Sequence, residues 1–68
     1  MSLSNTVQTN VLKYRRRQKL TQAALAEKAG ISVSYVSMLE RGRRTPPLET
    51  IEQLATALGV PALALLRS

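Results

Sequence analysis

The sequence predicts an all-α protein, a compact bundle of five short helices within a single domain of residues 1–68. Only two of the 68 residues are aromatic, both of them Tyr, whereas strands favour alternating aromatic and β-branched side chains. Apolar residues recur instead at spacings of three and four, as they do along one face of a helix. Three Gly and three Pro residues divide this pattern into short segments. A chain of this length forms one domain at most.

The first helix is expected within residues 5–19. Val7, Val11 and Tyr14 form its apolar stripe, and basic residues cover its other faces. Residues 1–5 are expected to be disordered or in part foreign to the natural chain, so they contribute nothing to the predicted fold.

The second and third helices have clear start and stop signals. The Thr21 hydroxyl can accept a hydrogen bond from a free backbone N–H at a helix start, and Gly30 can end that helix in the left-handed conformation because it has no Cβ. Ser32 is a second N-cap, and the helical pattern then runs to Arg41 before Gly42 closes it.

A basic loop and two further helices follow. The two consecutive prolines exclude residues 43–47 from a helix interior, because proline lacks a backbone N–H and restricts the residue before it. Helical spacing returns from Leu48 and ends at Gly59. Pro61 suits the first turn of a brief fifth helix over residues 62–66.

Composition and charge limit the classes of function. Ten Lys and Arg residues against four Glu give a net charge of +6, so the expected partner is a polyanion, with nucleic acid ahead of an anionic membrane. The chain has no Cys and no His, and therefore neither an ordinary zinc ligand set nor the usual general base. We expect a non-enzyme without a metal or cofactor.

The sequence predicts a location in the cytoplasm. No apolar run approaches the ~20 residues that span a bilayer, and the first residues lack the apolar stretch of a cleavable signal.

The connection between the second and third helices is the most specific feature. Two short helices joined by a turn of three or four residues that contains Gly cross steeply, as in a helix-turn-helix unit. Ala26 is small where such helices approach each other closely. The apolar residues expected to face one core are Leu25, Ala29, Ile31, Val36 and Leu39.

This arrangement resembles the lambda-repressor-like, Cro-type (XRE) helix-turn-helix DNA-binding family over about residues 11–66. The strings that carry the resemblance are Leu20-Thr21-Gln22, Leu25-Ala26, Ser34-Tyr35-Val36-Ser37, Leu39-Glu40-Arg41-Gly42, Leu48-Glu49-Thr50 and Ala57-Leu58-Gly59-Val60. The resemblance implies that the third helix, residues 32–41, enters the DNA major groove. It also implies a transcriptional regulator, usually a repressor, that acts as a two-fold homodimer on an inverted-repeat operator.

Two positions depart from the family pattern. Pro47 stands where a small polar residue often begins the fourth helix, so the cap of that helix is expected to come from Thr45 or from water. Leu63 stands where the family tends to place a polar residue. Leu63 and Leu66 are therefore candidates for the dimer interface, although Leu65 and Leu66 can equally well close the core of the monomer.

Four residues of the third helix are candidates for contact with base edges: Val33, Ser34, Ser37 and Met38. They share the face away from the expected core, and the resemblance makes them the family's reading positions. Apolar side chains can contact thymine methyl groups, while hydroxyls can donate or accept hydrogen bonds. The alternative is an exposed face without a reading role. No Arg, Gln or Asn is expected on this face, so direct readout should be weak and groove shape should matter more.

Five residues are candidates for contact with phosphates. Gln22 begins the second helix, where amides and helix N-termini bind phosphate, or it is simply solvated there. Thr21 can cap the helix, contact a phosphate, or do both. Tyr35 can donate to a phosphate or pack on the first helix. Arg43 and Arg44 lie on the loop beside the recognition helix, where they can bind phosphates or remain a solvated pair of charges.

Arg15 and Glu40 have a structural interpretation. The resemblance implies a pair between an Arg of the first helix and the Glu at the end of the recognition helix, and both residues match. Removing one member of a partly buried pair strands the other charge, at a cost of about 3–5 kcal/mol.

Three classes of function fit a small basic helical domain. The leading class is a DNA-binding regulator, either stand-alone, a controller of a restriction–modification system, or an antitoxin that also binds its cognate toxin. A second class is a protein-interaction module, whose binding would not show the salt dependence of phosphate contacts. A membrane binder is disfavoured, because the arginines beside Val11 and Tyr14 leave a narrow apolar face.

Overall fold

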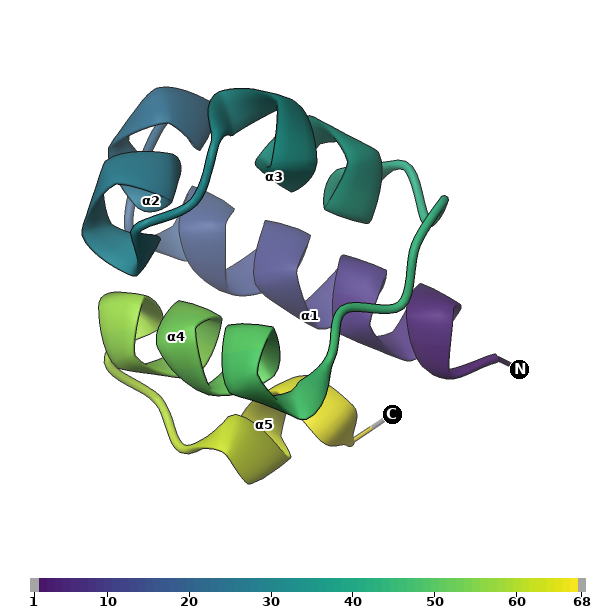
Figure 1. The fold of residues 1–68 in the computed structure, drawn as a ribbon. Helices are drawn as coiled ribbons and strands as arrows, with labels where there is room; N and C mark the ends of the chain where they lie inside the picture. Colours follow the sequence, from purple (N-terminus) through teal and green to yellow (C-terminus); the bar gives the residue numbers. More distant parts are fainter. Residues whose placement is uncertain (1, 68) are drawn as a thin grey trace.

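The computed structural model describes residues 2–67 and shows five helices in that part of the chain and no strand, which confirms the predicted fold class. The helices are α1 (Leu3–Arg17), α2 (Gln22–Ala29), α3 (Val33–Glu40), α4 (Leu48–Leu58) and α5 (Ala62–Leu66). Figure 1 shows α2 and α3 along one side of the molecule and α4 and α5 along the opposite side. α1 packs against α3, α4 and α5, and α2 packs against α3 and α4.

The predicted caps form at the ends of α2 and at the start of α3. The Thr21 hydroxyl accepts a hydrogen bond of 3.0 Å from the backbone N–H of Ala24. The Ser32 hydroxyl accepts one of 3.0 Å from Tyr35. Gly30 ends α2 at φ +72°, the left-handed conformation that favours glycine.

The prediction for the start of the chain is wrong in part. Among residues 1–5, which were expected to be disordered, Leu3–Asn5 form the first turn of α1, while Met1 lies outside the described residues. The physical reason is an N-cap, because the Ser2 hydroxyl accepts from the backbone N–H of Asn5. At its other end α1 stops at Arg17 rather than at Lys19, because Lys19 adopts a left-handed φ of +57°.

Of the two caps expected for α4, Thr45 or water, the Thr45 alternative is wrong. Pro47 is the N-cap residue of α4, and no side chain makes a cap hydrogen bond there. The Thr45 hydroxyl instead bonds to the hydroxyl of Ser4 on α1. This contact ties the loop after α3 to the first turn of α1.

One hydrophobic core joins all five helices. Its buried members are Val7, Val11, Leu25, Ala26, Ala29, Val36, Leu39, Ile51, Leu54, Ala55, Leu58 and Leu65. Ile31, which was expected in the core, is half-buried and packs against it. Because α3 contributes only Val36 and Leu39 to the fully buried set, its remaining faces are left for other contacts.

A buried amide attaches the end of the chain to α1. Asn10 is 5% exposed, and its Nδ2 donates to the carbonyl oxygen of Leu65 at 2.9 Å and to that of Arg67 at 2.7 Å. Both carbonyls belong to the end of α5, where helix carbonyls lack partners within the helix. Asn10 therefore supplies the donors that α5 itself cannot supply.

We expect Asn10→Ala to lower the free energy of unfolding by about 1–3 kcal/mol, because two carbonyl groups lose their donors in a buried setting. Urea unfolding followed by circular dichroism measures the change. Thr9→Ala is the matched control, since Thr9 is the exposed neighbour on the same helix. Equal midpoints for the two variants would contradict the role given to Asn10.

Candidate nucleic-acid interface

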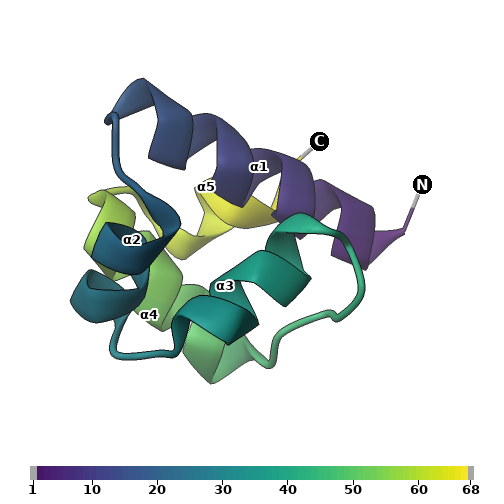
Figure 2. The same ribbon diagram turned by 90° about the horizontal axis from the view of Figure 1, so that it is seen from above.

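The helix-turn-helix unit presents one face of α3 to solvent. Residues 30–32 join α2 to α3, and the backbone N–H of Ile31 donates to the carbonyl of Ala26 at 3.0 Å, which fixes the turn. Val36 and Leu39 are buried on the inner face of α3. Figure 2 shows α3 from its outer side, where it crosses in front of α4 and no other helix covers it.

The four residues predicted to contact base edges lie together on this outer face. Val33 is 45% exposed, Ser34 is exposed, and Ser37 and Met38 are half-buried. All four line one shallow depression of about 360 Å³. These four residues bring two hydroxyls and two apolar side chains to the depression. In a major groove, hydroxyls can hydrogen-bond to base edges and apolar side chains can contact thymine methyl groups.

The expectation that no Arg, Gln or Asn lies on this face is wrong. Gln22, from the start of α2, and Arg41, the C-cap of α3, line the same depression. Spacing within a single helix could not show Gln22 there, because packing of α2 against α3 brings it to the depression. Arg41 was treated as the end of the helix, although its spacing from Ser37 and Met38 was a usable signal.

The remaining phosphate candidates divide into two groups. Arg43 and Arg44 are exposed on the loop that follows α3, and Thr21 is exposed at the start of α2, where its hydroxyl caps the helix. Tyr35 is half-buried and packs against the core. Gln22 uses one N–H of its amide to donate to Glu40 Oε1 at 2.9 Å.

A buried ion pair fixes the end of α3. Arg15 Nε lies 2.5 Å from Glu40 Oε2, and Arg15 Nη2 lies 3.0 Å from Glu40 Oε1. The two side chains are only 14% and 7% exposed. Gln8 adds a bond of 2.8 Å from its Nε2 to the backbone carbonyl of Glu40. Arg15 also donates to the carbonyl of Leu20 at 2.7 Å, so the network links the middle and the last turn of α1 to the end of α3 and to the segment before α2.

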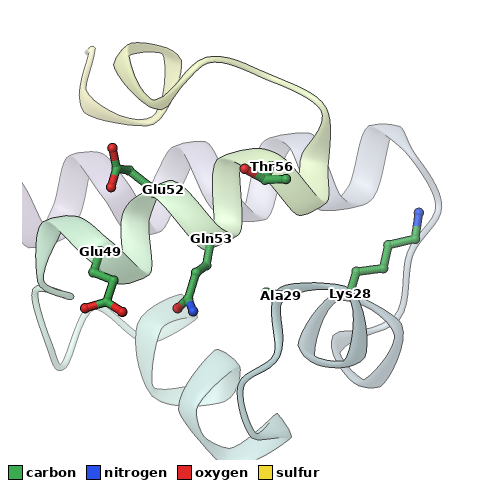
Figure 3. A pocket seen from close by; sticks show the side chains of 6 residues that line it. All are labelled: Lys28, Ala29, Glu49, Glu52, Gln53 and Thr56. Atoms are coloured by element: carbon green, nitrogen blue, oxygen red, sulfur yellow. The ribbon is translucent and has the colours of Figure 1, made fainter.

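A second depression, of about 350 Å³, lies between α2 and α4. Its lining residues are Lys28, Ala29, Glu49, Glu52, Gln53 and Thr56 (Figure 3). Two of the four carboxylates in the chain belong to this surface. Because they have the same sign of charge as phosphate, this side of the molecule is unsuited to DNA.

The leucines near the end of the chain differ in exposure. Leu63 is 59% exposed, Leu65 is fully buried, and Leu66 is half-buried against the core. Leu63 is therefore the candidate interface residue with the largest exposed surface.

Within residues 2–67, every helix is too short or too polar to cross a membrane.

Comparison with known proteins decides the family, because the model of a helix-turn-helix family matches residues 11–65 of the chain. The chain belongs to this helix-turn-helix family. The match confirms the resemblance drawn from the sequence. Family members are transcriptional regulators that bind double-stranded DNA and are not enzymes.

The chain is similar to a repressor and to two solved regulators. It is 45% identical over 60 residues to the immunity repressor protein of Bacillus phage phi105, a match that covers 88% of this chain and 42% of the repressor. A hypothetical transcription factor from Neisseria has a TM-score of 0.93 at 36% identity, with 97% of this chain and 76% of that one covered. The restriction-modification controller protein C.AhdI from Aeromonas hydrophila has a TM-score of 0.85 at 35% identity, with 88% and 91% covered.

We expect Glu40→Ala to lower the free energy of unfolding by about 3–5 kcal/mol, because it leaves the largely buried Arg15 guanidinium without its carboxylate. Thermal melting measures the loss. Glu27→Ala removes an exposed carboxylate of α2 and should melt as the unaltered protein does. A Glu40→Ala protein with an unchanged melting temperature would show that the pair is not structural.

Proposed function

We propose that this chain is a transcriptional repressor that binds a specific double-stranded DNA sequence. It acts in the cytoplasm as a homodimer on an inverted-repeat operator, with α3 in the major groove. The observation that carries the proposal is the outer face of α3, where Val33, Ser34, Ser37 and Met38 line one depression that the protein core leaves open.

Base contacts come from these four side chains. Val33 and Met38 pack against thymine methyl groups, and the hydroxyls of Ser34 and Ser37 exchange hydrogen bonds with base edges. All four side chains are short or flexible, so α3 must lie deep in the groove to reach the bases. Sequence-dependent groove width then adds to the discrimination.

Phosphate contacts come from the two borders of α3. Gln22 keeps a second amide N–H beyond the one that it gives to Glu40, and Thr21 lies beside it at the N-terminus of α2. On the other border, the exposed Arg43 and Arg44 bind the opposite phosphate backbone. The Tyr35 hydroxyl, at the edge of a ring that packs inward, completes the set.

A symmetric dimer is supported by the exposed Leu63 and the neighbouring, half-buried Leu66. Each subunit measures 28 × 22 × 21 Å, so two copies side by side can present their α3 helices about one DNA turn, ~34 Å, apart. The names of the relatives, a phage immunity repressor and a restriction-modification controller, support a regulatory role.

Selection of bound sequences from random duplexes should enrich an inverted repeat. On the enriched site, the logarithm of the binding constant should fall against the logarithm of salt concentration with a slope near −5 if roughly six phosphates are neutralised. A slope near zero would favour the protein-interaction alternative. Enrichment of a single unrepeated motif would contradict the symmetric dimer while leaving DNA binding intact.

We expect Leu63→Glu to convert the dimer to a monomer, because it places two carboxylates in the centre of an apolar contact. Sedimentation velocity measures the mass in the absence of DNA. Val33→Glu is the matched control, since it adds the same charge to another exposed apolar position, on α3. The control should remain dimeric and lose DNA binding. Equal masses for Leu63→Glu and the unaltered protein would exclude this interface.

A further inference from the structure

Arg41 lines the reading depression but has no role in the function proposed above. It is the C-cap residue of α3 and is exposed. The four side chains assigned to base contacts lack a group that can make two parallel hydrogen bonds to one base. An arginine beside them changes what this surface can recognise, because the guanidinium fork matches two acceptors at once.

The backbone holds Arg41 in the register of α3. Its φ and ψ are −89° and −1°, and its N–H donates to the carbonyl of Ser37 at 3.1 Å, as in a continuing helix. The N–H groups of Gly42 and Arg43 then bond to the carbonyls of Leu39 and Met38, at 3.0 and 3.2 Å. These two bonds form a Schellman motif, so the chain leaves the helix only at Gly42.

This register directs the Arg41 side chain over the reading face. Arg41 lies three residues after Met38, four after Ser37 and seven after Ser34, which places it on one stripe of the helix with them. Side chains of a helix point toward its N-terminus, so Arg41 extends over the turn that carries Ser37 and Met38. Because the residues four and seven positions before it are serines, the stripe has room for the long side chain.

The guanidinium of Arg41 is available to a ligand. Glu40, its neighbour in sequence, already accepts hydrogen bonds from Arg15 and Gln22. Within residues 2–67 the one ion pair joins Arg15 to Glu40, so no carboxylate of this part of the chain neutralises Arg41. The positive charge in the depression is therefore that of Arg41.

Arg43 and Arg44 differ from Arg41 in position. Both follow the left-handed turn at Gly42, whose φ is +70°, and they belong to the loop rather than to the helical stripe. Neither lines the depression. The three arginines therefore divide into one on the reading face and two beside it.

We propose that Arg41 reads a guanine in each half-site of the operator, by donating two hydrogen bonds to O6 and N7 in the major groove. The inference rests on the proposed function, since it requires α3 to occupy that groove. It assigns the main hydrogen-bonded base contact to the C-cap residue of α3 rather than to Val33, Ser34, Ser37 and Met38.

The test compares Arg41→Ala with Arg43→Ala, which removes an equal charge two residues away. Both variants are titrated on the selected operator and on duplexes in which each G·C pair is replaced in turn. The unaltered protein should lose about 10- to 100-fold in affinity when one particular G·C pair of the half-site is replaced. Arg41→Ala should bind the two duplexes equally, whereas Arg43→Ala should weaken both by the same factor and keep the preference.

Two further measurements separate a base contact from a phosphate contact. Replacing that guanine with 7-deazaguanine, which lacks the N7 acceptor, should weaken binding of the unaltered protein and leave Arg41→Ala unaffected. Arg41→Lys keeps the charge but not the planar fork, so it should reduce the guanine preference while it retains the nonspecific affinity. This variant also controls for a folding defect in the alanine variant.

The outcomes are distinct. If Arg41→Ala weakens all duplexes equally and makes the salt slope about 0.9 less negative, Arg41 binds a phosphate and the inference is overturned, while the proposed function stands. If the unaltered protein selects no duplex, the proposed function itself fails.

Discussion

The Glu40 carboxylate is the constraint on which the placement of the recognition helix depends. A carboxylate that is 7% exposed is costly to bury unless hydrogen-bond donors surround it. Here the donors come from two other helices, Arg15 of α1 and Gln22 of α2, and Gln8 of α1 holds the backbone carbonyl of the same residue. Because one end of α3 is bonded to both neighbours, α3 cannot change its angle to them without breaking charged hydrogen bonds. The largely buried Glu40 carboxylate therefore holds the outer face of α3 in a fixed orientation.

The same network reaches the surface of α3 that we propose binds DNA. Gln22 gives one amide N–H to Glu40, so the orientation of the amide is set by a residue of the next helix. Its other polar atoms then lie where Gln22 borders the depression of α3. Arg41 follows Glu40 directly as the C-cap residue, so helical geometry carries its side chain to a different face from the fixed carboxylate. Stability and the proposed recognition therefore depend on adjacent residues at the end of α3.

Local signals made most of the fold predictable from sequence. Thr21, Ser32 and Gly30 act within one helical turn of themselves, so neighbouring residues suffice to interpret them. The Ser2 cap that starts α1 is local as well, since its partner Asn5 is three residues away. Other features depend on partners distant in the chain. The Thr45 hydroxyl pairs with Ser4, 41 residues away, and Asn10 bonds to carbonyls 55 and 57 residues away. No spacing rule specifies such pairs, because tertiary packing creates them.

The candidate site shows the same division between local and tertiary information. Val33, Ser34, Ser37 and Met38 belong to one stripe of one helix, so periodicity alone places them on a common face. That stripe is made of short or flexible side chains, which cost little to desolvate and let the helix backbone approach the floor of a groove. Such a surface can bury contact area and match the shape of a groove more readily than it can make directional hydrogen bonds to bases. Directional contacts must then come from longer side chains at its edges. Helical periodicity and capping bring Arg41 to that edge, whereas only the packing of α2 against α3 brings Gln22 there.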